Sequence, residues 1–265
     1  MRLDDYRHLV DLDRPFTPAA GPARPAEFGA LVARLTGGPD RERLRALLTV
    51  REPGPLPDDA HRALDALLGG ERAGRPHVDA RELPTIDGTV ALWQGDITTL
   101  RADAIVNAAN SALLGCFQPS HRCVDNVIHA AAGPRLRADC HTIMTAQGTP
   151  EPSGGAKITR GYHLPARYVL HTVGPIVDGP LTPAHEAVLA SSYRSCLDLA
   201  AAAGDIRTVA FCAISTGLFG FPKAAAARIA LGTTAAWLAA HPGVLDRVVF
   251  DVFSADDLAV YKEAL

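Results

Sequence analysis

The chain has 265 residues, enough for one large α/β domain with a small addition or for two modest domains. Its 26 Lys and Arg against 29 Asp and Glu give a net charge of −3 and a pI of about 6.4. This balance excludes the basic surface of a protein that binds duplex nucleic acid or anionic membranes. No apolar run is long enough to span a bilayer, the N-terminus has no secretory signal, and five cysteines do not indicate a disulfide framework. We therefore expect a cytoplasmic protein.

The first 85 residues predict a small helical extension. They are rich in Pro, Arg, Asp and Leu, and short stretches of helical periodicity centre on residues 28–35, 44–48 and 60–68. Gly and Pro clusters separate these stretches. No catalytic or metal-binding constellation lies among them, so we expect helices that pack on the main domain without supplying chemistry.

From residue 86 onwards, short β-branched runs alternate with alanine-rich helical stretches. The predicted strands are 89–93, 104–107, 156–160, 168–172, 208–213 and 247–252. The predicted helices are 124–132, 135–145, 185–203, 223–240 and 255–265. This alternation is typical of an α/β fold with helices on both faces of a central sheet.

Two polar residues follow the first two predicted strands. Asp96, in Gly95-Asp96-Ile97-Thr98, can accept a hydrogen bond from the amino group of a base. Asn110, at the end of Val106-Asn107-Ala108-Ala109-Asn110, can hold a sugar hydroxyl. Taken singly, each residue is more often a helix cap or a turn former. Their position at strand ends, where open α/β sheets bind ligands, favours a binding role.

The segment from Gly115 to His129 carries the sharpest signal. Cys116, His121 and Cys123 fall within eight residues, and thiolate and imidazole are the ligands that zinc prefers. Three protein ligands with an open fourth position are typical of catalytic zinc. The alternative is that the cysteines are small buried hydrophobes. Asp125 follows at a predicted helix start, where it can be the catalytic acid or base, a helix-start carboxylate or a fourth zinc ligand. His129, one helical turn later, lies on the same face of that predicted helix.

The remaining candidate segment is Ile214 to Pro222, between a predicted strand and a predicted helix. Its glycines and hydroxyl residues at a helix N-terminus predict a phosphate cradle, although a plain turn fits equally well. Cys140, Cys196 and Cys212 lie within predicted helices or strands, and we expect them to pack in the core.

Taken together, these motifs resemble the macrodomains that hydrolyse ADP-ribosyl esters. The likeness covers residues 86–265 and rests on five motifs in order: Gly95 to Thr98, Val106 to Asn110, Asp125 with Ile128-His129, Tyr168 to Pro175, and Ser215 to Gly220. Common members carry a run of glycines where this chain has Cys116 to Cys123. That departure resembles the zinc-containing branch, which also has an N-terminal helical extension. The implied fold is a three-layer α/β/α sandwich with a mixed central sheet.

The resemblance also implies roles for individual residues. Asp96, with Ile97, would pair with the adenine, Phe253 would stack on it, and Asn110 would face the distal ribose beside a Zn²⁺ ion. The phosphates would be wrapped by Ser215, Thr216, Gly217, Leu218 and Phe219. The implied partners are ADP-ribose and a mono-ADP-ribosylated protein, with a lipoyl-carrier protein and a sirtuin-type transferase as associates.

Two other functions remain open at this level. Some macrodomains bind ADP-ribose without hydrolysing it, and a metalloenzyme acting on a free nucleotide sugar is a third possibility. The Cys/His triad beside Asp125 favours the hydrolase, because a reader has no evident need for an open metal position. We expect Asp125, assisted by Asn110 and zinc, to orient or deprotonate the attacking group.

Overall fold

The structure, a computed structural model, describes residues 1–17, 26–38 and 40–265. Its α-helices are α1 (Leu3–Tyr6), α2 (Ala26–Thr36), α3 (Arg41–Val50), α4 (Asp58–Ala73), α5 (Val124–Ala132), α6 (Pro134–Gln147), α7 (Pro183–Ala203), α8 (Lys223–Ala240) and α9 (Ala255–Ala264). Short 3₁₀ turns lie at η1 (Ala80–Glu82) and η2 (Ile97–Thr99). No helix in these described ranges combines the length and the apolar character needed to cross a membrane.

The strands are β1 (Val78–Asp79), β2 (Val90–Gln94), β3 (Leu100–Arg101), β4 (Ala104–Ala109), β5 (Ala156–Arg160), β6 (Tyr168–Val173), β7 (Thr208–Phe211) and β8 (Arg247–Val252). Six of them form one sheet in the order β2-β8-β7-β4-β6-β5, while β1 and β3 form a separate parallel pair. All pairings within the large sheet are parallel except β5 with β6. The sheet is therefore mixed, and every parallel strand ends at the same edge.

Local sequence signals set several of these boundaries. α7 begins after Thr182, whose hydroxyl accepts from the N–H of His185, and it ends at Gly204 with φ of 85°. α9 begins after Ser254, its N-cap, which forms a reciprocal capping box with Asp257. The strand predicted at 208–213 ends earlier, at Phe211, because the chain turns where the Thr216 hydroxyl donates to the carbonyl of Ala213.

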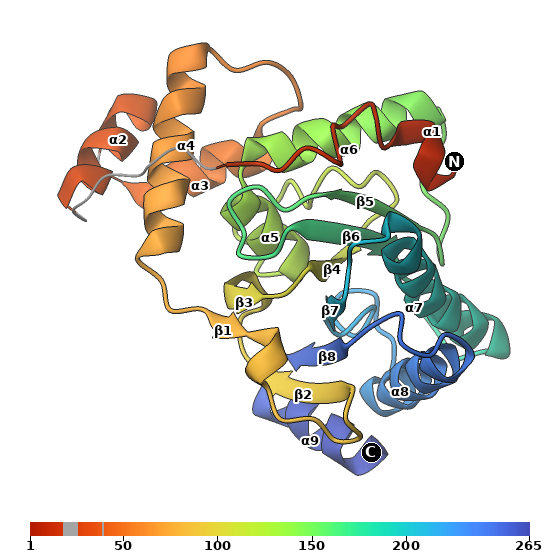
Figure 1. Ribbon diagram of the computed structural model, residues 1–265. Helices are drawn as coiled ribbons and strands as arrows, with labels where there is room; N and C mark the ends of the chain where they lie inside the picture. The colour runs from red at the N-terminus through yellow and green to blue at the C-terminus, as the bar shows by residue number, and fades with distance from the viewer. Residues whose placement is uncertain (18–25, 39) are drawn as a thin grey trace.

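Helices cover both faces of the sheet, as Figure 1 shows: α5 and α6 lie on one side and α7, α8 and α9 on the other. The strands between these layers are almost wholly buried. On the α7 side the core holds packed aromatic rings from Tyr193, Phe211, Phe250 and Tyr261. The predicted three-layer α/β/α class is confirmed by this arrangement.

The N-terminal region contributes to two cores. Helices α2, α3 and α4 share a small cluster of Val32, Leu44, Leu64 and Leu67. Residues before α2 instead join the main core, where Tyr6 is fully buried and its hydroxyl accepts from the N–H of Ile158. Residues 18–25 and 39 of the predicted extension lie outside the described part of the chain. The boundary between residues 85 and 86 stays a prediction.

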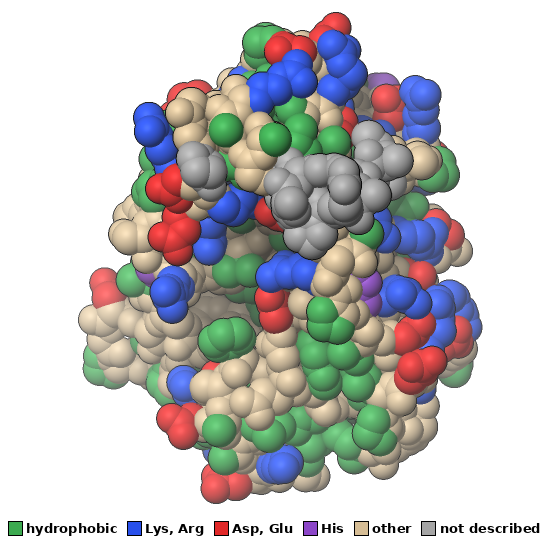
Figure 2. Space-filling view, turned by 90° about the vertical axis from the view of Figure 1, so that its left-hand side faces the viewer, with side chains coloured by type: hydrophobic (Ala, Val, Ile, Leu, Met, Phe, Trp, Pro, Cys, Tyr) green, Lys and Arg blue, Asp and Glu red, His purple; other side chains and the backbone are tan. Residues whose placement is uncertain are grey.

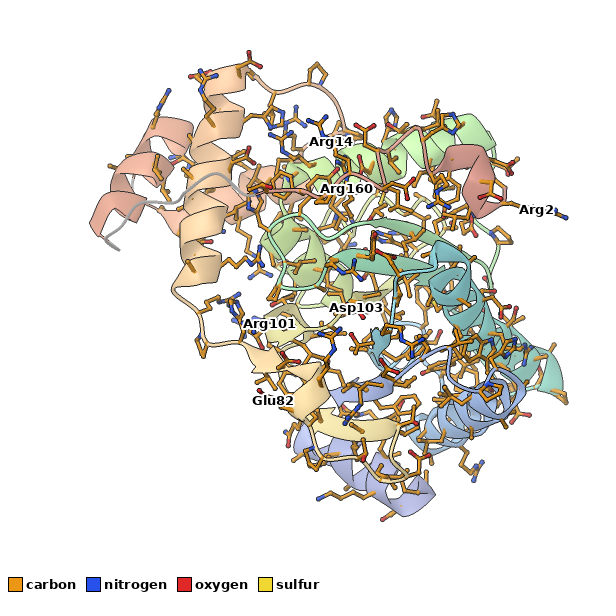
Figure 3. The ribbon with its side chains drawn as sticks, viewed as in Figure 1. Arg2, Arg14, Glu82, Arg101, Asp103 and Arg160 are labelled. Atoms are coloured by element: carbon orange, nitrogen blue, oxygen red, sulfur yellow. The ribbon has the colours of Figure 1, made fainter. Side chains whose placement is uncertain are left out.

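The amino edge of the sheet is closed by a charged cluster around Asp103, labelled in Figure 3. This buried carboxylate accepts from the backbone N–H groups of Arg207 and Thr208 and pairs with the side chains of Arg81 and Arg167. The N–H donors and cations hold the pKa of Asp103 below its usual value even though burial opposes them. The carboxyl edge is left for the candidate site.

Candidate active site

The predicted site residues all lie at the carboxyl edge of the large sheet. Asp96 follows β2, Phe253 follows β8, the segment 215–219 follows β7, and Asn110 follows β4. Neighbouring strands are spaced by about 4.8 Å, so the edge from β2 to β4 spans roughly 14 Å. The strand order β2-β8-β7-β4 thus arranges these residues in a row that ends at the loop carrying Cys116, His121 and Cys123.

At one end of the row, Asp96 is held by its own turn. Its Oδ1 accepts from the backbone N–H of Thr98 at 3.0 Å and from the Thr98 hydroxyl at 2.6 Å. Ile97, the next residue, is buried, whereas the side chain of Phe253, which follows the paired strand β8, is 79% exposed. A fixed carboxylate beside an exposed aromatic ring suits a planar base, which can stack and donate its amino group.

Asp251, in β8, is a residue of this region that the sequence did not suggest. Its side chain is buried, and Oδ1 has no hydrogen-bond partner among the described atoms. Burial and the nearby Asp96 raise the pKa of Asp251 to about 8, so the carboxyl is neutral at pH 7.

The segment 215–219 has the features of an anion cradle. Ser215 is buried with φ of +64°, a conformation that non-glycine residues rarely adopt. The loop is closed by bonds from the N–H of Phe221 to the carbonyl of Ser215 and from the N–H of Gly220 to the carbonyl of Gly217. Within the described hydrogen bonds, no N–H of residues 216–219 is a donor. Those groups are available for a phosphate.

Gly174, directly after β6, supports this cradle by close packing. A Cβ on Gly174 would lie 2.0 Å from the Ser215 hydroxyl oxygen, so only glycine fits there. A Cβ on Gly220 would lie 2.6 Å from the carbonyl oxygen of Val177. Leu218 projects outwards at 80% exposure. The resemblance motifs after β6 and β7 therefore meet in one structural unit.

Asn110 shapes the loop that follows β4. Its amide donates to the carbonyl of Gly115 at 2.9 Å, and its Oδ1 accepts from the N–H of Ala112 at 3.0 Å. Leu113, Gly115 and Phe117 all have positive φ, so the chain turns tightly before the Cys/His segment. The observed role of Asn110 is to close this turn, and its contact with a ribose stays a prediction.

The Cys116, His121 and Cys123 side chains come together as their spacing suggested. The two sulfurs and one imidazole nitrogen lie within 4.8 Å of one another, and Cys116 Sγ is 3.1 Å from His121 Nδ1. Ligands at about 2.0–2.3 Å from a tetrahedral zinc are separated by less than 4 Å, so small side-chain adjustments suffice. Donor chemistry and spacing both fit zinc, with Cys116, His121 and Cys123 as its ligands.

Asn126 ties this loop to α5. Its amide nitrogen donates to the carbonyls of Gln118 and His121, at 2.7 and 2.8 Å. Cys123 is the N-cap of α5 and its sulfur accepts from the N–H of Asn126. Local sequence patterns assigned Asn126 no role, and its burial, which requires partners for the amide, is known only from the structure.

Asp125 lies in the first turn of α5 and is buried at the start of a polar network. Its Oδ1 accepts from the Asn107 amide at 2.8 Å and lies 3.4 Å from His129 Nε2. Burial raises the pKa of Asp125 to about 6, opposed by Asn107 and Arg137. Burial also lowers the pKa of His129 well below its usual value, so the two do not form an ion pair.

The network continues through His171 in β6. The Asn107 amide is 3.2 Å from His171 Nδ1, and His171 Nε2 is 2.9 Å from the Thr159 hydroxyl. Burial lowers the pKa of His171 to about 3, so the ring is neutral and accepts from Asn107 at Nδ1. A polar Asn in a strand of apolar neighbours marked this network in the sequence.

Cys140, Cys196 and Cys212 are buried, which confirms their predicted packing.

Arg137 connects the N-terminal helices to the site. Its guanidinium donates to the carbonyls of Leu48 and Arg51 at the end of α3, and it lies 4.5 Å over the ring of Phe117. The same side chain is buried close to Gly115. Arg137 therefore links the extension to the loop that carries the predicted metal ligands.

Comparisons with known proteins agree with this geometry. The profile of the Macro domain family matches residues 106–230. Protein-ADP-ribose hydrolases of Treponema medium and Staphylococcus aureus are 46% and 48% identical, and each alignment covers 84% of this chain and 86% or 84% of the relative. The Trypanosoma brucei macrodomain in complex with ADP-ribose is 34% identical, with 84% of this chain and 95% of that chain covered and a TM-score of 0.64. The chain belongs to the macrodomain family, as do the enzymes named protein-ADP-ribose hydrolase.

Proposed function

We propose that this chain is a zinc-dependent hydrolase that removes mono-ADP-ribose from modified protein side chains, with esters of Asp and Glu as the expected linkage. The observation that carries the proposal is the row of residues along the carboxyl edge. Base-directed, phosphate-directed and ribose-directed groups follow one another in the order of an ADP-ribose molecule. The row ends at the Cys/His triad, whose last member, Cys123, is the N-cap of the helix that carries Asp125.

The metal ligands in this proposal are Cys116, His121 and Cys123. When bound, zinc supplies a Lewis acid that polarises a water or fixes the pose of a ribose hydroxyl. Two thiolates and one imidazole leave a fourth position open. Asp125 follows Cys123 by two residues in the first turn of α5, and its carboxylate is not among the three clustered donors.

The chain's own residues supply the rest of the proposed mechanism. Asp96 and Phe253 hold the base, and the free N–H groups of 216–219 hold the diphosphate. Asp125, fixed by the Asn107 amide, orients the attacking group or takes its proton at the carboxylate. Because His129 and His171 are neutral, neither histidine neutralises Asp125, and the cation that lowers its pKa is Arg137.

The test combines metal analysis with an activity assay. Purified protein should contain one zinc per chain and should release ADP-ribose from a mono-ADP-ribosylated protein, and a chelator should stop the release. Cys196→Ala is the matched control, since it removes a buried cysteine of α7 outside the triad. Binding of ADP-ribose without any release would instead identify a reader module. The lipoyl-carrier protein, the sirtuin-type transferase and a cytoplasmic location rest on the resemblance and the sequence alone.

A further inference from the structure

A cavity of about 870 Å³ lies on the flank of the molecule, between the N-terminal helices and α5. Residues of α3 and the C-terminal part of α4 line one side, and Val127, Ala130 and Ala131 of α5 line the other. Figure 2 faces this flank and shows a hollow bordered by Lys and Arg side chains. None of the residues assigned above to metal, base or phosphate lines this basic cavity. It is a separate feature that the proposed mechanism does not use.

Positive charge is in excess in the basic cavity. Arg41, Arg45, Arg72 and Arg75 line it together with two glutamates, Glu42 and Glu71. Arg41 is already neutralised, because it makes a two-pronged pair with Glu71 at 2.7 and 3.0 Å. Among the ion pairs of the described residues, none involves Arg45, Arg72 or Arg75. The chain as a whole has a net charge of −3, so this local excess is opposite in sign to the net charge.

The cations also repel one another. Burial lowers the pKa of the Arg72 guanidinium, and Arg101, labelled in Figure 3, lowers it further. Burial lowers the pKa of His77, another lining residue, and Arg72, Arg101 and Arg75 act in the same direction. Clustered positive charges that outnumber the nearby carboxylates disfavour the folded chain. A bound anion would relieve that repulsion, so the cavity favours an anionic ligand.

The shape of the basic cavity narrows the class of anion. Opposite the arginines, the lining is apolar and comes from α5, Leu68 and Pro165. A small inorganic anion would use only the arginine side. A peptide with acidic and apolar side chains would use both sides, and guanidinium groups bind carboxylates with two parallel hydrogen bonds. We propose that the basic cavity binds an acidic segment of the ADP-ribosylated protein, an inference that rests on the proposed function.

The cavity is close enough to Asp125 for one substrate to reach both. Asp125 and Ala131 lie six residues apart on α5, which corresponds to roughly 9 Å along its axis at about 1.5 Å per residue. At about 100° per residue, the lining residues Val127, Ala130 and Ala131 lie on the opposite face of α5 from Asp125, so the substrate has to pass round a helix about 10 Å in diameter. A specific protein interface buries about 800 Å² per partner, a patch roughly 30 Å across. An extended chain covers about 3.3 Å per residue. Acidic residues about four to eight positions from the modified side chain would therefore reach the arginines.

The experiment uses two synthetic peptides with one mono-ADP-ribosylated Glu. They differ only at the positions that lie about four to eight residues before and after the modified Glu. One peptide carries Asp and Glu at these positions, and the other carries Asn and Gln. Wild-type protein should hydrolyse the acidic peptide with about tenfold higher kcat/KM, mostly through KM. The preference should fade at 0.5 M NaCl, where screening shortens the reach of charge interactions to a few ångströms.

Three variants assign the preference to the cavity. Arg45→Gln/Arg72→Gln/Arg75→Gln should hydrolyse the two peptides equally while keeping its affinity for free ADP-ribose, which also shows that it is folded. Arg75→Gln alone, at an exposed position, should lose about half of the preference. The control Arg194→Gln/Arg228→Gln removes exposed charges from α7 and α8, on the other side of the sheet, and should behave as wild type.

Binding of the unmodified acidic peptide, measured by fluorescence anisotropy, separates this inference from the proposed function. If wild-type protein hydrolyses neither peptide, the proposed hydrolase is wrong, but arginine-dependent binding of the acidic peptide would still support the docking site. Equal kcat/KM for both peptides in wild type, or a preference that survives the triple substitution, would overturn the inference. Arginine-dependent binding of pyrophosphate without peptide binding would show a small-anion site instead.

Discussion

Replacing Asp251 by Asn keeps the shape of a buried side chain and removes its ionisation. The pKa of Asp251 is raised from an ordinary value near 4 to about 8, first by burial and then by Asp96. Between these two values the folded state binds one more proton than the unfolded state. The free energy of unfolding must then fall as pH rises, by about 1.4 kcal/mol per pH unit from this one group. From pH 5 to pH 7 that amounts to roughly 2–3 kcal/mol.

The assay is urea unfolding at pH 5, 6 and 7 for wild type and Asp251→Asn. Other titrating groups cancel in the difference, so the variant should gain about 1.4 kcal/mol over wild type for each pH unit. Asp96→Asn should lower the pKa of Asp251 and shrink this gain, since the carboxylate of Asp96 raises it. Asp178→Asn, at an exposed position, is the control and should show no such trend. Parallel stability curves for wild type and Asp251→Asn would refute a neutral Asp251.

Three further outcomes are expected. Cys123→Ala should lose zinc, measured by elemental analysis, because it removes one of three clustered ligands; full occupancy would exclude the triad. Asp125→Ala should keep zinc and ADP-ribose binding while the hydrolysis rate falls by about 10²-fold, the usual scale for removing an acid or base. A rate near that of wild type would show that Asp125 is only a helix-start carboxylate. Loss of zinc would show that Asp125 is the fourth ligand. Asp96→Ala should weaken ADP-ribose binding about tenfold in calorimetry, because the base amino group loses its acceptor at a cost of about 1–3 kcal/mol; equal affinities would remove Asp96 from the site.

Short-range sequence patterns were sufficient to predict most helices and strands of the main domain. The predicted spans of α5, α8, β5 and β8 match the observed ones, since apolar periodicity and nearby Gly, Ser or Pro residues mark their ends. The two-residue strands β1 and β3 were not predicted. Their pairing joins residues 78–79 to 100–101, and so short a run carries no periodic signal of its own.

The sequence by itself determined the chemical types and the local grouping of the site residues. Cys116, His121 and Cys123 are close in the chain, so a single loop suffices to bring their donor atoms together, whatever the rest of the fold. Asp96 and the segment 215–219 could be recognised for the same reason, because strand-end turns and helix starts are built from neighbouring residues.

Only the tertiary structure decided how those groups are arranged and supported. The strand order that lines up β2, β8, β7 and β4 depends on pairings between distant segments, which local patterns do not encode. Asp251 becomes neutral because the sheet buries it beside Asp96, and Asn107 fixes Asp125 across 18 residues of sequence. The basic cavity likewise exists only because α3 and α4 pack near α5. Burial and long-range charge contacts arise only in the folded chain, so local sequence patterns neither singled out Asp251 and the cavity arginines nor assigned a role to Asn107.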